Sequence, residues 1–159
     1  MSFKNALALV GWILLAEAAG AVGSLVTVPS ILAWYATLAR PELAPPNWVF
    51  GPVWTTLFLL MGIAAFLVWR TRTRAKGSTK ALWAFAIQLA LNVLWSFLFF
   101  GLHSPGGAFV EIILLWAAIL YTIVLFAKVS KPAAYLLIPY IAWVSFAGYL
   151  NFMIWVLNS

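Results

Sequence analysis

Five long apolar segments constrain the fold of this chain more than any other feature. A helix needs about 20 apolar residues to cross the hydrocarbon core of a bilayer. We expect membrane-spanning helices at about residues 6–28, 47–69, 81–100, 108–127 and 133–157. A membrane barrel would need segments of about ten residues with strict alternation, which the sequence lacks. The sequence therefore predicts an all-α polytopic membrane protein, in which a single domain over residues 1–159 forms a five-transmembrane-helix bundle.

The composition agrees with lipid as the solvent for much of the surface. Hydrophobic residues make up 66% of the chain and charged residues 8%, whereas a soluble domain is about a quarter charged. The net charge of +6 does not indicate nucleic-acid binding, because the charges lie at the ends of the apolar segments. Cysteine is absent, which excludes a disulfide framework, thiol chemistry and a thiolate metal site.

The start of the first segment has features of a signal peptide. Lys4 precedes an apolar stretch, and Ala16-Glu17-Ala18 imitates a small-residue cleavage site. The apolar run nevertheless continues to about Val28, which is long enough to span a bilayer. We therefore predict an uncleaved first helix.

The charges between the segments predict the orientation. One side of the membrane would carry Lys4, Arg70, Arg72, Arg74, Lys76, Lys80, Lys128 and Lys131. The other side has only Arg40, offset by Glu42, and His103. The positive-inside rule then places the N-terminus in the cytoplasm, and the C-terminus and the proline-rich loop 29–46 on the outer side. The arginine run is typical of an anchor at anionic lipid headgroups.

Aromatic and polar side chains share faces on three of the expected helices. They are Phe50 and Trp54 in the second, Gln88, Asn92 and Ser96 in the third, and Tyr140, Trp143, Ala147 and Asn151 in the fifth. From the helical rise, Trp54, Asn92 and Trp143 lie roughly 12, 14 and 20 Å below the outer ends of their helices. Two interpretations fit equally: a cavity for a flat apolar ligand, or an ordinary core with interhelical hydrogen bonds.

Two acids fall within the apolar segments. Glu17 lies mid-helix, and an acid at membrane depth is a functional candidate. Glu111 lies in the first turns of the fourth segment, where it would reach the interface or support the helix N-terminus. The one histidine, His103, lies in a turn beside Gly and Pro and is interpreted as a loop residue. Hydrolytic, metal-dependent or nucleotide-dependent chemistry is not indicated, and no cofactor is required.

Small residues recur at the spacing that lets helices approach closely. The rows are Ala16, Gly20 and Ser24, then Ala19 and Gly23, and in the third segment Ala86 and Ala90. Such rows pack helices within one subunit or between two, and a homodimer is a reasonable hypothesis.

Three long motifs resemble a known family. They are WYATLARPELAPPNWVFGPVW at 34–54, LNVLWSFLFF at 91–100 and PYIAWVSFAGYLN at 139–151. Together they resemble the TspO/MBR family, also called translocator proteins, tryptophan-rich sensory proteins or peripheral benzodiazepine receptors. The resemblance implies a five-helix bundle, commonly dimeric, that binds porphyrins, sterols and benzodiazepine-like drugs.

The resemblance also implies a pocket beneath the first loop. By motif position the lining would be Tyr35, Pro46, Trp54, Asn92, Trp143, Ala147 and Leu150, and Phe50 joins them because it shares a face with Trp54. Some family members degrade protoporphyrin in light, and tryptophans at the positions of Trp54 and Trp143 are implicated as photochemical groups. The expected function is therefore a membrane binding protein for porphyrins and similar flat apolar ligands, with light-dependent degradation or a sensory role.

Other functions and ligands stay open. A transporter or channel for a tetrapyrrole, sterol or other metabolite is the alternative, motivated by the polar stripe and Glu17, and a regulatory partner without chemistry of its own is a third. Some family members end the fifth helix with a sterol pattern of Tyr and then Arg. The end of this chain, LNFMIWVLNS, has no basic residue, although the segment Leu32–Tyr35–Arg40 fits a looser sterol pattern.

Overall fold

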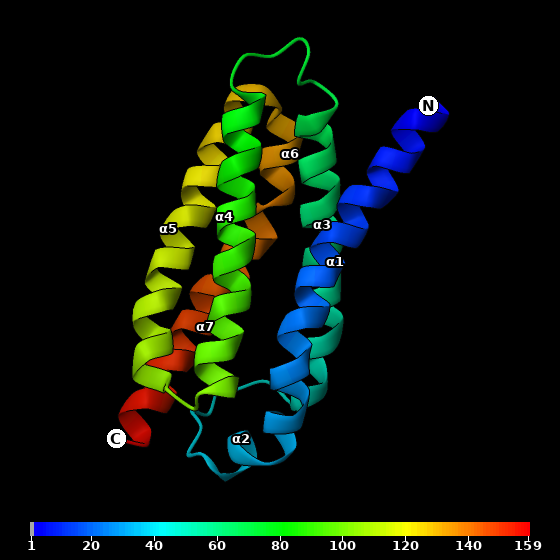
Figure 1. Cartoon of the computed structure of the whole chain (residues 1–159). Helices are drawn as coiled ribbons and strands as arrows, with labels where there is room; N and C mark the ends of the chain where they lie inside the picture. The colour runs from blue at the N-terminus through cyan, green and yellow to red at the C-terminus, as the bar shows by residue number, and fades with distance from the viewer. Residues whose placement is uncertain (1) are drawn as a thin grey trace.

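The computed structural model describes residues 2–159, and their regular structure is helical. In chain order the helices are α1 (Phe3–Leu32), α2 (Trp34–Thr37), α3 (Asn47–Trp69), α4 (Ser78–Ser96), the π-helix η1 (Phe97–Gly101), α5 (Pro105–Val129), α6 (Lys131–Leu136) and α7 (Ile138–Leu157). They form five segments that are long and apolar enough to cross a membrane: α1, α3, α4 with η1, α5, and α6 with α7. The predicted all-α membrane bundle is confirmed (Figure 1).

Helix α1 continues beyond the end that the sequence suggested. We expected the chain to leave the helix at Pro29, but α1 includes this proline and ends at Leu32. A proline within the last turn removes one backbone hydrogen bond without stopping the helix. The Oγ of Ser30 donates to the carbonyl oxygen of Phe100 at 2.6 Å, which fastens this last turn to η1. The expected loop 29–46 therefore begins with a helical turn and contains α2.

The fifth segment is two helices. We expected one continuous helix over 133–157 with a kink at Pro139, whereas α6 and α7 are separated at Leu137. Pro139 lies in the first turn of α7, where its missing N–H needs no helical partner. The segment also begins earlier, because Pro132 occupies the first turn of α6.

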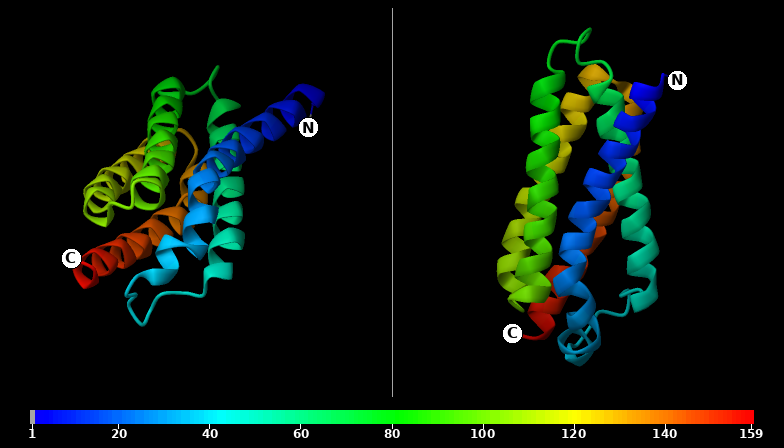
Figure 2. Two further views of the ribbon diagram at one scale, coloured as in Figure 1. Left: turned by 60° about the horizontal axis from the view of Figure 1, so that its bottom comes forward. Right: turned by 45° about the vertical axis from the view of Figure 1, so that its right-hand side comes forward.

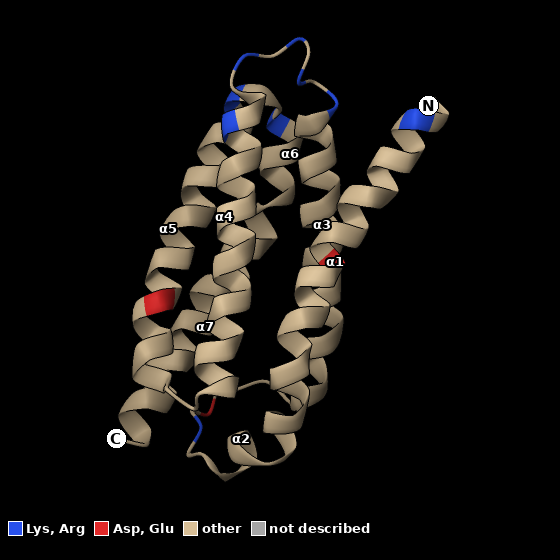
Figure 3. Cartoon of the chain, viewed as in Figure 1, with Lys and Arg blue, Asp and Glu red and all other residues tan. Residues whose placement is uncertain are grey.

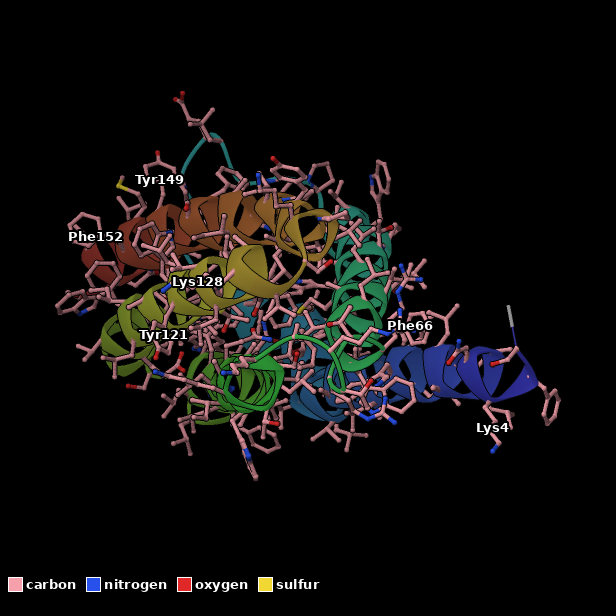
Figure 4. The ribbon with its side chains drawn as sticks, turned by 90° about the horizontal axis from the view of Figure 1, so that it is seen from above. Lys4, Phe66, Tyr121, Lys128, Tyr149 and Phe152 are labelled. Carbon is pink, nitrogen blue, oxygen red and sulfur yellow. The ribbon has the colours of Figure 1, made fainter. Side chains whose placement is uncertain are left out.

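The helices surround a core of large side chains. α1 packs along α3 and α4, α5 packs between α4 and α7, and α6 packs on α3. Tyr140, Phe85 and Phe126 are among the largest fully buried side chains. Tyr149 and Phe152 of α7 point outward from the bundle, as a lipid-facing surface requires (Figure 4).

Glycine sets the distance between α1 and α3. A Cβ on Gly62 of α3 would lie 2.5 Å from the Cα of Ile13. One on Gly20 of α1 would lie 2.5 Å from the ring of Phe58. Part of the small-residue row thus packs helices within the subunit. Beyond this contact the N-terminal part of α1 diverges from the other helices (Figure 2).

The two ends of the bundle differ in charge. One end, called the basic end, carries Lys4 at the start of α1, the connection 70–77, Lys80, Lys128 and Lys131 (Figure 3). One of its arginines packs on an adjacent aromatic residue, since the guanidinium of Arg72 lies 3.6 Å from the ring centroid of Trp69. The other end, called the loop end, carries α2 and the connection 38–46. The described termini lie at opposite ends.

Candidate ligand-binding site

A cavity of about 640 Å³ lies among α1, α3, α4 with η1, and α7. Ligand pockets for small molecules are about 300–1,000 Å³, so the cavity has the size of a binding site. Its lining runs from Asn47 and Trp48, where α3 begins at the loop end, to Glu17 halfway along α1. The helices that we expected to form a pocket therefore do so, with α1 as an additional wall.

Aromatic rings form most of the cavity walls. Phe50, Trp54 and Phe58 come from successive turns of α3, while Trp95 comes from α4 and Trp143 from α7. The ring centroids of Trp54 and Phe58 are 5.6 Å apart. Those of Phe50 and Trp143 are 6.1 Å apart with a T-shaped geometry, so these two rings join α3 to α7 across the cavity. Such walls suit a flat apolar ligand.

A chain of buried hydrogen bonds joins α4 to α7 next to the cavity. The Nδ2 of Asn92 donates to the Tyr140 hydroxyl at 2.9 Å, and that hydroxyl donates to Oε1 of Gln88 at 2.9 Å. Gln88 and Asn92 are 1% and 5% exposed, so the polar stripe faces the interior as expected. Asn92 also lines the cavity. Gln88 therefore belongs to the buried core, whereas Asn92 belongs both to the hydrogen-bond chain and to the cavity wall.

A second hydrogen-bond pair fixes Trp95. Its Nε1 donates to Oδ1 of Asn151 at 3.0 Å, and Nδ2 of Asn151 donates to the carbonyl oxygen of Pro105 at 2.7 Å. One asparagine therefore joins α4, α5 and α7, and it holds the indole of Trp95 at the cavity wall.

Trp143 has an unused donor. Its Nε1 is buried and has no acceptor among the described residues. A buried indole N–H without a partner is costly, and Trp143 lines the cavity. Because this nitrogen is itself inaccessible, Trp143 contributes its ring and not its N–H to the cavity wall.

The expected site residues fall into three groups. Five of them line the large cavity: Phe50, Trp54, Asn92, Trp143 and Ala147. Tyr35 and Leu150 line a small adjoining cavity of about 30 Å³. Pro46 lines neither, because it is the exposed cap before α3 and sets the start of that helix.

Tyr35 closes the loop end. It is 4% exposed and packs against Phe99 and Phe100, with ring centroids 6.3 and 5.9 Å away. Burial raises the pKa of its phenol, and the nearby Arg40 guanidinium opposes that shift. The phenol is therefore neutral at ordinary pH, and α2 presents an uncharged aromatic surface beside the cavity.

Sequence reasoning overlooked the wall that α1 provides. Glu17, Gly20, Ser24 and Thr27 all line the cavity. Polar residues at 17, 24 and 27 share one face of an otherwise apolar helix. This spacing could have predicted that α1 turns a polar face toward the cavity. The small residues were interpreted only as packing positions.

Two further expectations concern charged or titratable residues. Glu111 was expected to reach the interface or the helix N-terminus, but it is 5% exposed, and neither carboxylate oxygen has a partner among residues 2–159. The reason is its place on the face of α5 that also buries Ala108 and Ile112.

His103 stacks on Trp34, and the centroids of their rings are 4.4 Å apart. The described residues contain no group of three potential metal ligands.

The fold and the cavity together define a class: an integral membrane protein with a ligand-sized aromatic cavity inside a five-helix bundle. The chain belongs to the TspO/MBR family, whose model matches residues 12–156. This match confirms the resemblance seen in the sequence motifs.

Several relatives are similar over nearly their whole length. "Tryptophan-rich protein TspO" from Chlorobaculum tepidum is 47% identical, over 98% of this chain and 98% of that protein. "Translocator protein" from Bos taurus is 39% identical, over 94% of this chain and 89% of its own length. "Tryptophan-rich sensory protein" from Cereibacter sphaeroides is 35% identical, over 92% of each chain.

Proposed function

We propose that this protein binds porphyrins and similar flat apolar ligands in the cavity among α1, α3, α4 and α7. The observation that carries the proposal is the 640 Å³ cavity walled by the aromatic rings of Phe50, Trp54 and Trp143. Flat macrocycles bury apolar surface against such rings. In this proposal the porphyrin is a ligand and not a required cofactor.

Titration of protoporphyrin against purified protein tests the proposal. Binding should quench tryptophan fluorescence, and replacing Trp54 and Trp143 by Phe should weaken binding by about tenfold or more, since the double change removes aromatic ring area from the cavity wall. Trp83, which is 67% exposed on α4, gives the matched control as Trp83→Phe. Equal affinity of the Trp54/Trp143 variant and the wild-type protein would place the ligand elsewhere.

The same two tryptophans support slow light-dependent porphyrin degradation as an extension of the proposal. An indole beside an excited porphyrin is an oxidisable partner, and both rings line the cavity. Illumination of the complex in the presence of oxygen should yield photoproducts that decrease in the double Phe variant. A sensory or regulatory role remains compatible with binding alone.

Transport is the second candidate function. The observation that favours it is the depth of the cavity, which extends from the loop end to Glu17 in the middle of α1. Flux of a tetrapyrrole into proteoliposomes that depends on Glu17 would favour transport over binding. The segments show no inverted repeat, which many transporters possess.

We further propose that the basic end faces the cytoplasm and the loop end faces outward. The charge difference between the ends supports this orientation, because cytoplasmic connections are enriched in Lys and Arg. Protease access to the connection 38–46 in intact cells or right-side-out vesicles tests it. In this orientation the connection 70–77 rests at anionic headgroups.

A further inference from the structure

Glu17 is the only acidic residue that lines the cavity. No described side chain bonds to its carboxylate. The other polar lining side chains, such as Ser24 and Thr27, are uncharged hydroxyls or amides. Glu17 is therefore the lining group that can bring a negative charge into the cavity.

The depth of Glu17 makes a partner valuable. It lies halfway along the 30-residue α1, roughly 21 Å from Phe3 at the helical rise. The lysines and arginines of the described chain all lie near the ends of the bundle. A carboxylate at membrane depth is costly without a counter-charge, so a cationic ligand group would gain a strong interaction there.

Aromatic rings surround the same part of the cavity. Gly20, one turn after Glu17, is where the ring of Phe58 packs against α1, and Trp54 lies 5.6 Å from Phe58 by ring centroids. An acid next to aromatic faces is the combination that recognises an organic ammonium group, because the ring quadrupole and the carboxylate both attract the cation. A neutral flat ligand would use the rings alone.

Part of the cavity lining is exposed on the outside of the bundle. Ser24 and Val28 of α1 and Trp48 of α3 line the cavity yet are exposed, and they lie on two helices that run side by side (Figure 2). An apolar amine that partitions into the bilayer would meet these exposed lining residues, which lie between Glu17 and the loop end.

We infer that the cavity selects flat apolar ligands that carry a protonated amine, with the ammonium group on the Glu17 carboxylate and the apolar body against the α3 wall formed by Trp54 and Phe58. The inference rests on the proposed function only in using the same cavity. It adds a preference for amine-bearing ligands over neutral ones, because aromatic walls alone would bind flat ligands of both kinds.

Two pyrene probes test this selection. 1-Pyrenemethylamine and 1-pyrenemethanol share one flat apolar body and differ in the ammonium group. Their binding to the full-length protein in zwitterionic nanodiscs is followed by energy transfer from tryptophan, with empty nanodiscs as the partition blank. The wild-type protein should bind the amine about tenfold more tightly than the alcohol, as expected for a hydrogen bond to a charged group.

Variants assign the preference to one carboxylate. Glu17→Gln should reduce the amine-to-alcohol affinity ratio to about one, whereas Glu17→Asp should retain a clear preference because it keeps the charge. Glu42→Gln is the matched control, since Glu42 is an exposed acid outside the cavity. Equal affinity of the wild-type protein for both probes, or an amine preference that survives Glu17→Gln, would overturn the inference.

A second readout covers the case in which Glu17→Gln disturbs folding. Infrared difference spectra of the wild-type protein should show a carboxylate band when the amine binds and none when the alcohol binds. No such band would also overturn the inference. Failure of the proposed function looks different: the Trp54/Trp143 Phe variant would then keep its affinity for protoporphyrin whatever the pyrene ratio is.

Discussion

At the scale of residues, Tyr140 links the core to the cavity through one hydroxyl. Tyr140→Phe leaves the Nδ2 of Asn92 and the Oε1 of Gln88 without partners. Interhelical hydrogen bonds in membranes are worth about 0.6 kcal/mol each, so we expect a loss of about 1 kcal/mol in unfolding free energy. Unfolding in mixed micelles measures it. Tyr149→Phe, at an exposed site of α7, should change little, and equal stability of both variants would contradict the assignment.

At the scale of elements, the contact between α1 and α3 positions the wall of the cavity. Gly62→Ala would place a Cβ 2.5 Å from the Cα of Ile13, so α1 must move. Overpacking of this kind costs about 1–3 kcal/mol, and we expect lower thermal stability together with weaker porphyrin binding. Gly11→Ala is the control, because a Cβ there meets nothing within 4 Å. Unaltered stability and binding in Gly62→Ala would show that the contact between α1 and α3 does not position the cavity wall.

At the scale of the whole molecule, we propose that two copies associate through the outer face of α4. Ala86 and Ala90 are exposed there, between larger exposed side chains such as Trp83 and Leu94. Small residues at this spacing allow close helix contact in lipid. Replacing both alanines by Leu should decrease the dimer fraction several-fold in cross-linking of native membranes, while Ala117→Leu on α5 should not. Recovery of monomer alone from the wild-type protein would exclude the dimer.

The sequence predicted most of the secondary structure because its signals are local. Apolar length gives the spans, and α3 coincides with the expected residues 47–69. The ends were less predictable where tertiary contacts act. Ser30 holds the turn after Pro29 against η1 by a hydrogen bond to the carbonyl oxygen of Phe100. The local sequence around Pro29 does not predict this bond, because Phe100 is distant in the chain.

The sequence by itself determined that the chain is a five-helix membrane protein of the TspO/MBR family, since hydrophobic length and contiguous motifs do not depend on long-range packing. Only the tertiary structure decided which polar groups find partners. It joined Asn92 to Tyr140, left the N–H of Trp143 unpaired, buried Glu111 and placed Glu17 at the cavity. Each outcome depends on how neighbouring helices are rotated against one another, and side-chain packing sets that rotation.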